Sequence, residues 1–180
     1  GDVYKRQFEA QYQLASVLSW NKKYDEAARI YEALAAKSDD PRLAPRLAEI
    51  ALWSGQYDVA LDRYYRLLKA DWRQPELWQG YIDAASAAKT LPADPHKAQI
   101  LRICAEAAAA PTADAERLGR FAWVLRRLDE PKKSVALLKR ALELDPKSRE
   151  LRRSLAEALS AAEEYEEAEK QYRILLQASP

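Results

Sequence analysis

The sequence predicts an all-α protein made of about five antiparallel helix pairs stacked into a solenoid. Its composition favours helices, because only 4 of 180 residues are glycine and because Ala, Leu, Glu, Lys and Arg prevail over the β-branched residues of strands. A sequence phrase also repeats: an aromatic residue is followed three positions later by Ala and seven positions later by Tyr, beginning at Tyr24, Tyr57 and Tyr165. The first two copies lie 33 residues apart, a period typical of stacked helical repeats.

The first two repeats are the most regular. Residues 8–40 contain two stretches of apolar residues at helical spacing, separated by a polar turn. Pro41 closes this repeat, because proline disfavours helix at the residue before it and suits the first turn of the next helix. Residues 41–74 form the second repeat, and Gly55 lies where its hairpin must bend sharply. Residues 1–7 fit no repeat, so we expect an irregular leader there.

The later repeats are less uniform. The third repeat, 75–110, contains a longer and stiffer connection at 90–95 than the other hairpins have. The fourth and fifth repeats cover residues 111–145 and 146–180. No Gly/Ser linker or low-complexity tract separates any of the repeats, so the sequence predicts one continuous domain from residue 8 to residue 180.

Charge and hydropathy exclude some classes of partner. The 29 basic and 28 acidic residues nearly cancel, so the whole chain has no electrostatic drive toward nucleic acid. No stretch approaches the roughly 18–20 apolar residues of a membrane span, so we expect a soluble protein without direct membrane insertion. A lone cysteine leaves the compartment open between cytoplasm and bacterial periplasm. Because the chain lacks any Met, we also expect it to be a fragment of a larger protein.

The residues needed for catalysis are missing from the pattern. His96 is the single histidine, and its polar surroundings predict an exposed residue at a helix start rather than part of a triad or a metal site. Cys104 lies in an apolar run, where we expect a buried structural thiol. Four scattered glycines form no phosphate-binding loop. The sequence therefore predicts no catalytic residue, cofactor or metal, and no enzyme.

These patterns together resemble the tetratricopeptide repeat family, over about residues 8–180. The resemblance is carried by a set of residues in one repeating frame: Leu14, Ala15, Tyr24, Ala27, Tyr31, Leu47, Ala48, Gly55, Tyr57, Ala60, Tyr64, Ala141, Pro146, Leu155, Ala156, Leu159, Tyr165, Ala168, Tyr172, Leu175 and Pro180. It implies a right-handed superhelix in which the first helix of each pair lines a concave groove. It also implies that the tyrosines at 24, 57 and 165 fill the wedge at each turn.

Aligning the first helices by their small residue predicts which side chains face the groove. These are Tyr12, Ser16, Glu49, Gln79, Asp83, Trp123, Arg126, Arg153 and Glu157. Because tryptophan and arginine are favoured binding anchors, we expect an acidic or aromatic segment to be held by Arg120, Trp123, Arg126 and Arg127. The alternative is that the tryptophan packs against the neighbouring repeat and the arginines are solvated. Two other tryptophans, Trp20 and Trp53, end first helices and are expected to be packing residues.

The first hypothesis for function is a non-catalytic scaffold that binds a protein or peptide segment in the groove. The alternative is a repeat segment of a larger bacterial envelope or polysaccharide-export assembly protein, acting as a structural module. Binding to nucleic acid is not expected, because a basic stripe is missing. The fifth repeat has no polar capping helix, so its end face with Ala168, Leu175 and Leu176 is expected to meet more of the chain or another copy. The partner, the compartment and the oligomeric state stay open.

Overall fold

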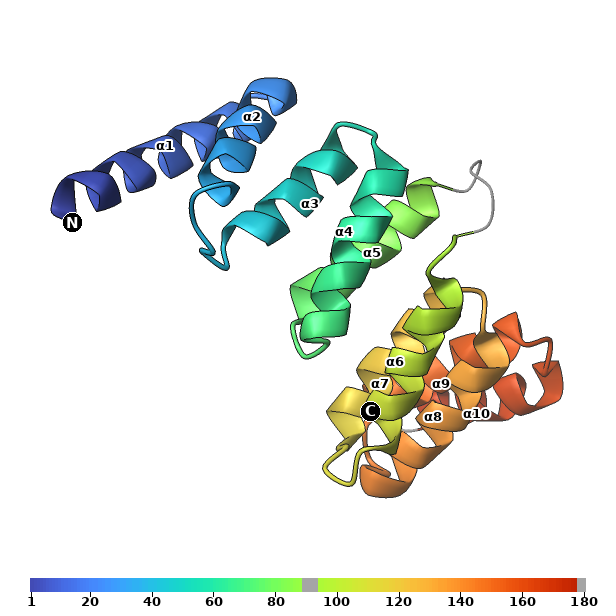
Figure 1. Ribbon diagram of the computed structural model, residues 1–180. Helices are drawn as coiled ribbons and strands as arrows, with labels where there is room; N and C mark the ends of the chain where they lie inside the picture. The colour runs from blue at the N-terminus through green and yellow to red at the C-terminus, as the bar shows by residue number, and fades with distance from the viewer. Residues whose placement is uncertain (89–93, 178–180) are drawn as a thin grey trace. The chain divides into compact units, whose positions relative to one another are not determined.

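The computed structural model describes residues 1–88 and 94–177, and within these ranges the chain forms ten α-helices and no strand (Figure 1). The predicted all-α fold is therefore confirmed. The chain divides into two compact units, residues 1–96 and 97–180. The division falls inside the third predicted repeat, and most of the stiff connection expected at 90–95 lies outside the described residues.

The first unit contains five helices that alternate in direction. They are α1 (Asp2–Trp20), α2 (Tyr24–Ala35), α3 (Leu43–Trp53), α4 (Tyr57–Ala70) and α5 (Pro75–Ala87). Helices that follow one another in the chain pack together, and α3 also contacts α5, so first helices of successive pairs are neighbours. Asp2 begins α1, so the irregular leader expected over residues 1–7 is wrong. The acidic side chain of Asp2 suits the positive end of the helix dipole.

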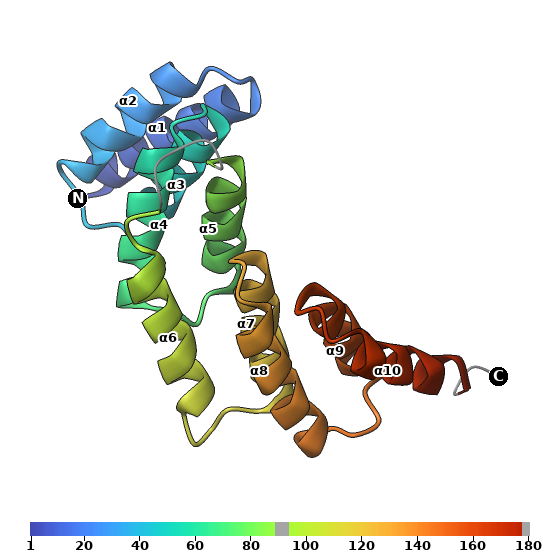
Figure 2. The same cartoon turned by 90° about the vertical axis from the view of Figure 1, so that its right-hand side faces the viewer.

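The second unit contains the other five helices. They are α6 (Lys97–Ala109), α7 (Ala115–Arg127), α8 (Pro131–Leu144), α9 (Arg149–Ala161) and α10 (Tyr165–Gln177). The pairs α7–α8 and α9–α10 form antiparallel hairpins (Figure 2). As in the first unit, the first helices of successive pairs, α7 and α9, contact each other. This contact positions the candidate site.

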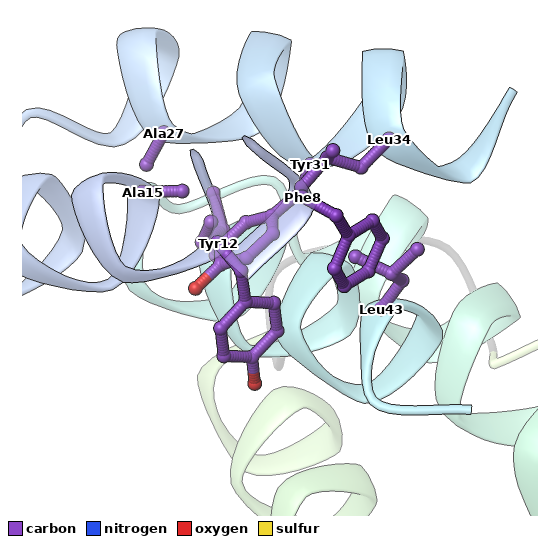
Figure 3. Close-up of a cluster of buried hydrophobic side chains, with 8 residues drawn as sticks. Phe8, Tyr12, Ala15, Ala27, Tyr31, Leu34 and Leu43 are labelled. Carbon is purple, nitrogen blue, oxygen red and sulfur yellow. The ribbon is translucent and has the colours of Figure 1, made fainter. Parts of the chain in front are cut away.

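Small residues at the helix contacts let aromatic side chains fill the core of the first unit. Ala15 of α1 and Ala27 of α2 are fully buried, and beside them Tyr12 meets Tyr31 edge to face with ring centroids 5.4 Å apart (Figure 3). Phe8 stacks on Tyr12 at a centroid distance of 6.4 Å. Such offset and edge-on ring pairs add to the stabilisation that buried area supplies. The second unit has an equivalent core of aliphatic residues.

The hairpin turns share one hydrogen-bonding pattern. At the first turn, Lys22 N–H donates to the Ser19 carbonyl at 3.0 Å, and the next N–H reaches back to Leu18 at 2.8 Å. This pair of bonds is a Schellman motif, which satisfies the last carbonyls of a helix and needs one residue at positive φ. That residue is Lys22, Gly55, Asp129 or Glu163 in the four turns. The sharp bend predicted at Gly55, with φ of 79°, is confirmed.

Candidate functional site

In the second unit, a surface cavity of about 440 Å³ lies between α7 and α9. Its lining residues come from α7, from the α8–α9 connection and from α9: Ala115, Glu116, Gly119, Arg120, Trp123, Asp145, Ser148, Glu150, Leu151 and Ser154. Two of the residues singled out from the sequence, Arg120 and Trp123, are among them. The cavity therefore forms between two first helices, where the repeat pattern places the groove.

Helical spacing brings the α7 residues to one face. Glu116, Arg120 and Trp123 follow each other at intervals of four and three residues, so their side chains lie over successive turns. Asp114 begins this helix by accepting a hydrogen bond from the Arg117 backbone N–H at 2.8 Å. In the same way, Ser148 accepts from the Leu151 backbone N–H at 3.2 Å and caps α9. Both first helices thus start with a satisfied cap at the cavity end.

Gly119 permits the close approach of the two helices. A Cβ atom at this position would lie 2.7 Å from Cδ2 of Leu151, which is inside van der Waals contact. Trp123, one turn further along, is half-buried, so part of its ring stays accessible in the cavity. The cavity therefore combines an aromatic surface with an aliphatic side chain, as binding sites for side chains commonly do.

The arginines near the cavity are already paired with glutamates. Arg120 Nη2 lies 2.9 Å from Glu116 Oε1 on its own helix. Arg126 Nη1 lies 2.6 Å from Glu157 Oε2, and this pair joins α7 to α9. Their charges are thereby neutralised locally, so the structure does not support the expected grip of these arginines on an acidic segment. The Arg126–Glu157 pair joins positions 31 residues apart, which is not the repeat period of 33 residues, so the period did not reveal it.

Two carboxylates at the rim have no such partner. Asp145 and Glu150 line the cavity and are exposed. Among the described residues, no ion pair involves either of them. The lining thus contains three carboxylates and one guanidinium, so its net charge is negative. The other expected arginines, Arg127 and Arg153, are exposed and do not line the cavity.

The predicted groove residues of the first unit form two separate groups. Tyr12 and Ser16 are buried: the Ser16 hydroxyl lies 2.7 Å from the Tyr31 hydroxyl, and Tyr12 Oη accepts a hydrogen bond from Arg46 at 3.2 Å. Burial raises the pKa of Tyr31, which keeps its hydroxyl protonated. Glu49 joins the network through Arg46 at 2.7 Å.

The other group lies on α5 and is exposed. There the Gln79 amide donates a hydrogen bond to Asp83 at 2.8 Å. Both residues belong to one helix, and the pair spans a single turn. The first group, Tyr12, Ser16 and Glu49, therefore lines no cavity described here. The second group, Gln79 and Asp83, lies on an open helix surface.

The residues exposed on the end face of α10 are not the ones predicted. Ala168 is buried in the hairpin core, Leu175 is half-buried, and Leu176 is 74% exposed. Two tyrosines are also exposed: Tyr165, which the resemblance placed in the wedge at the turn, and Tyr172. Of their equivalents in the first two repeats, Tyr31 and Tyr64 are buried and Tyr24 and Tyr57 are half-buried, and a further helix packs against each of those hairpins. In the described part of the chain, α10 packs mainly against α9 and has no such cover.

Two tryptophans expected in the packing are on the surface instead. Trp20 is the last residue of α1 and is 69% exposed. Trp53 is 45% exposed, with one ring contact to Tyr24 at a centroid distance of 6.4 Å. The expectation was wrong because a residue at the last position of a helix can project past the neighbouring helix.

His96 is not the exposed helix-start residue expected. Its ring stacks on Tyr65 at a centroid distance of 4.3 Å, and its Nε2 lies 3.4 Å from Asp62 Oδ1.

Cys104 is buried as predicted, and burial raises the pKa of its thiol to about 12. Within residues 1–88 and 94–177, no group of three or more His, Cys, Asp or Glu side chains is arranged to hold a metal ion. No described helix has the length and hydropathy needed to cross a bilayer.

Repeated antiparallel hairpins, small residues at their contacts and a cavity between first helices define a helical-hairpin repeat protein. Family profiles of the tetratricopeptide repeat match residues 9–40 and 125–180. These matches support the assignment of the chain to the tetratricopeptide repeat family. This fold suggests a protein-interaction scaffold, and proteins with these repeats are generally non-catalytic scaffolds.

Solved structures of MamA share the fold. One crystal structure of MamA protein is 16% identical, with a TM-score of 0.60 over 94% of this chain and 90% of that chain. MamA from Desulfovibrio magneticus RS-1 is 15% identical, with a TM-score of 0.60 over 94% of this chain and 93% of that chain. At this identity, the likeness concerns the fold alone. No curated protein sequence matches the chain.

Proposed function

We propose that the chain is a non-catalytic interaction scaffold that binds a protein segment in the cavity between α7 and α9. The observation that carries this proposal is Trp123, which is half-buried and lines a cavity of about 440 Å³. Ligand cavities commonly measure about 300–1,000 Å³, so this one has room for large side chains of a bound segment. A partly buried tryptophan flanked by polar residues is a frequent binding hot spot.

The test is selection of short peptides from a displayed random library on the immobilised protein. We expect Trp123→Ala to weaken the selected peptides by about 30-fold, because hot-spot truncation costs about 2 kcal/mol or more. Trp53→Ala is the matched control, since this tryptophan is exposed outside the cavity. Equal binding by the wild type and Trp123→Ala would reject the proposal.

A second variant tests the same site in case Trp123→Ala fails to fold. Ser154 of α9 lines the cavity and is half-buried, so Ser154→Phe fills the cavity without removing a packed side chain. It should abolish capture of the same peptides while circular dichroism shows unchanged helix content. Undiminished capture by Ser154→Phe would place the binding surface elsewhere.

A second candidate function is assembly through the outer face of α10. The exposed side chains of Tyr165, Tyr172 and Leu176 favour it, because an apolar surface of this kind is normally covered in helical repeats. A second copy of the chain is the occupant to test first. Light scattering should then show a concentration-dependent dimer that Leu176→Ser and Tyr165→Ser remove. A monomer at all concentrations would reject self-association.

A further inference from the structure

We propose that the cavity between α7 and α9 selects a cationic side chain, arginine or lysine, of the bound segment. This inference rests on the proposed function and adds the chemistry of the ligand. It begins from the charges at the cavity: Glu116, Asp145 and Glu150 against the single guanidinium of Arg120. A cation entering the cavity would reduce the excess of negative charge, whereas an acidic side chain would increase it.

The pairing of these charges sharpens the argument. Arg120 is held 2.9 Å from Glu116, so the two nearly cancel. The excess therefore lies on Asp145, at the end of α8, and on Glu150, in the first turn of α9. Neither takes part in an ion pair of the described residues, and both are exposed at the cavity. They are positioned to accept charge-assisted hydrogen bonds from a ligand.

The starts of α7 and α9 would favour an anion instead, because a helix N-terminus attracts negative charge. At α7 this attraction is already met by the Asp114 cap and by Glu116 in the first turn. The same holds at α9. Ser148 accepts the hydrogen bond of the Leu151 backbone N–H, and Glu150 places its own carboxylate in the first turn. A second anion would meet this carboxylate before it reached the remaining N–H groups. The balance at the cavity thus remains in favour of a cation.

The uncharged part of the lining fits the same ligand. Tryptophan is the strongest cation–π partner among aromatic side chains, and Trp123 presents part of its ring to the cavity. Leu151 offers an apolar surface for the methylene stem of arginine or lysine. An aromatic face, an aliphatic side chain and two carboxylates therefore meet in one cavity. Each matches a different part of a long basic side chain.

The experiment uses synthetic peptide libraries that have one fixed central residue and randomised flanks. The centres are arginine, lysine, citrulline, leucine and glutamate, and binding to the whole protein is measured by fluorescence anisotropy at low salt. Citrulline has nearly the shape of arginine but no charge. We expect the arginine and lysine libraries to bind about fivefold to tenfold more tightly than the citrulline library, as two exposed ion pairs would produce. This preference should shrink at high salt.

Variants assign the preference to the cavity. The double variant Asp145→Asn/Glu150→Gln should bind the arginine and citrulline libraries alike. The control variant Glu106→Gln/Glu143→Gln removes two exposed carboxylates of the same unit that do not line the cavity, so it should keep the preference. Equal preference in both double variants would overturn the inference, because the selectivity would then come from net charge alone.

The outcomes separate this inference from the proposal on which it rests. Binding that depends on Trp123 but is equal for arginine, citrulline and leucine would overturn the cationic preference and leave the scaffold function standing. Trp123-dependent binding that prefers the glutamate library would likewise overturn the cationic preference and leave the scaffold function standing. If no library binds in a Trp123-dependent manner, the site itself is wrong and both proposals fall.

Discussion

Gly80 of α5 and the ring of Tyr64 on α4 are in direct contact. A Cβ atom at position 80 would overlap Cζ of the tyrosine, well inside van der Waals distance. The ring is 3% exposed, and its environment is packed on both sides of α4. Burial raises the pKa of its hydroxyl far above the ordinary value, with Glu49 and Asp83 as smaller causes. The contact between α4 and α5 thus depends on the absence of a side chain at one position.

Gly80→Ala should therefore destabilise the first unit by about 1–3 kcal/mol, the usual cost of overpacking a core. The reason is that a rigid aromatic ring must move as a whole. Urea titration followed by circular dichroism measures the effect. Gly119→Ala is the matched control, because its Cβ would meet only the flexible end of Leu151. If both variants lose the same stability, the ring contact is less rigid than the structure indicates.

Gly55→Ala tests the hairpin turn alone. The residue has φ of 79°, and nothing lies within 4 Å of a Cβ built there, so only backbone strain can act. We expect a loss of about 1–2 kcal/mol, the cost of left-handed geometry in a residue with a side chain. In the opposite sense, Asp129→Gly relieves the same strain at an equivalent turn and should not destabilise. A neutral Gly55→Ala variant would contradict the turn geometry.

Acid should weaken the first unit through Arg42. Its guanidinium holds the pKa of Asp40 below the ordinary value, and it does the same for Glu9 together with a larger effect of the Gln13 hydrogen bond. Because the folded pKa values are lower than the unfolded ones, these carboxyls stabilise the fold above the unfolded pKa of about 4. That stabilisation is lost as pH falls through the folded values.

The variant Arg42→Met keeps much of the contact with Phe8 and Tyr12 but removes the charge. Its urea midpoint should fall less than that of the wild type between about pH 5 and pH 3. Arg29→Met, which changes net charge equally at an exposed site, is the control and should follow the wild type. If the urea midpoints of all three proteins fall equally between about pH 5 and pH 3, Arg42 is not the cause of the acid sensitivity.

The ion pair of Arg126 and Glu157 should couple α7 to α9 only weakly. The side chains are 29% and 38% exposed, so solvent screens much of the attraction across 2.6 Å. A double-mutant cycle with Arg126→Met and Glu157→Gln should give a coupling of about 0.2–1 kcal/mol in urea unfolding. A coupling above this range would show that the pair is better shielded than its exposure indicates.

The sequence allowed prediction of the features that repeat. The helix pairs, the bend at Gly55, the buried small residues such as Ala48 and the location of Trp123 on a first helix beside a cavity all follow from the helical period and the repeat frame. Each depends on neighbours within one repeat or in the next. Local spacing therefore contains the necessary information.

Features that depend on which side chains pair with each other were not predicted. The arginines of α7 were expected to bind a ligand, yet Arg120 and Arg126 pair with glutamates. His96 was expected in solvent, yet it stacks on Tyr65 of α4. Residues 1–7 fit no repeat but extend α1, since a helix can continue beyond the part that packs. Such outcomes require the three-dimensional contacts.

The sparse burial of α10 also makes this helix easier to open than α8. This helix buries only Ala168 and Gln171 among its described residues, and the side-chain oxygen Oε1 of Gln171 accepts one hydrogen bond from Arg152 of α9. Its amide protons should therefore exchange with solvent sooner than those of α8, which has packed neighbours on both sides. A protease would find its first cleavage sites there. The final hairpin can in this way be lost while the preceding one, which holds Trp123, remains folded.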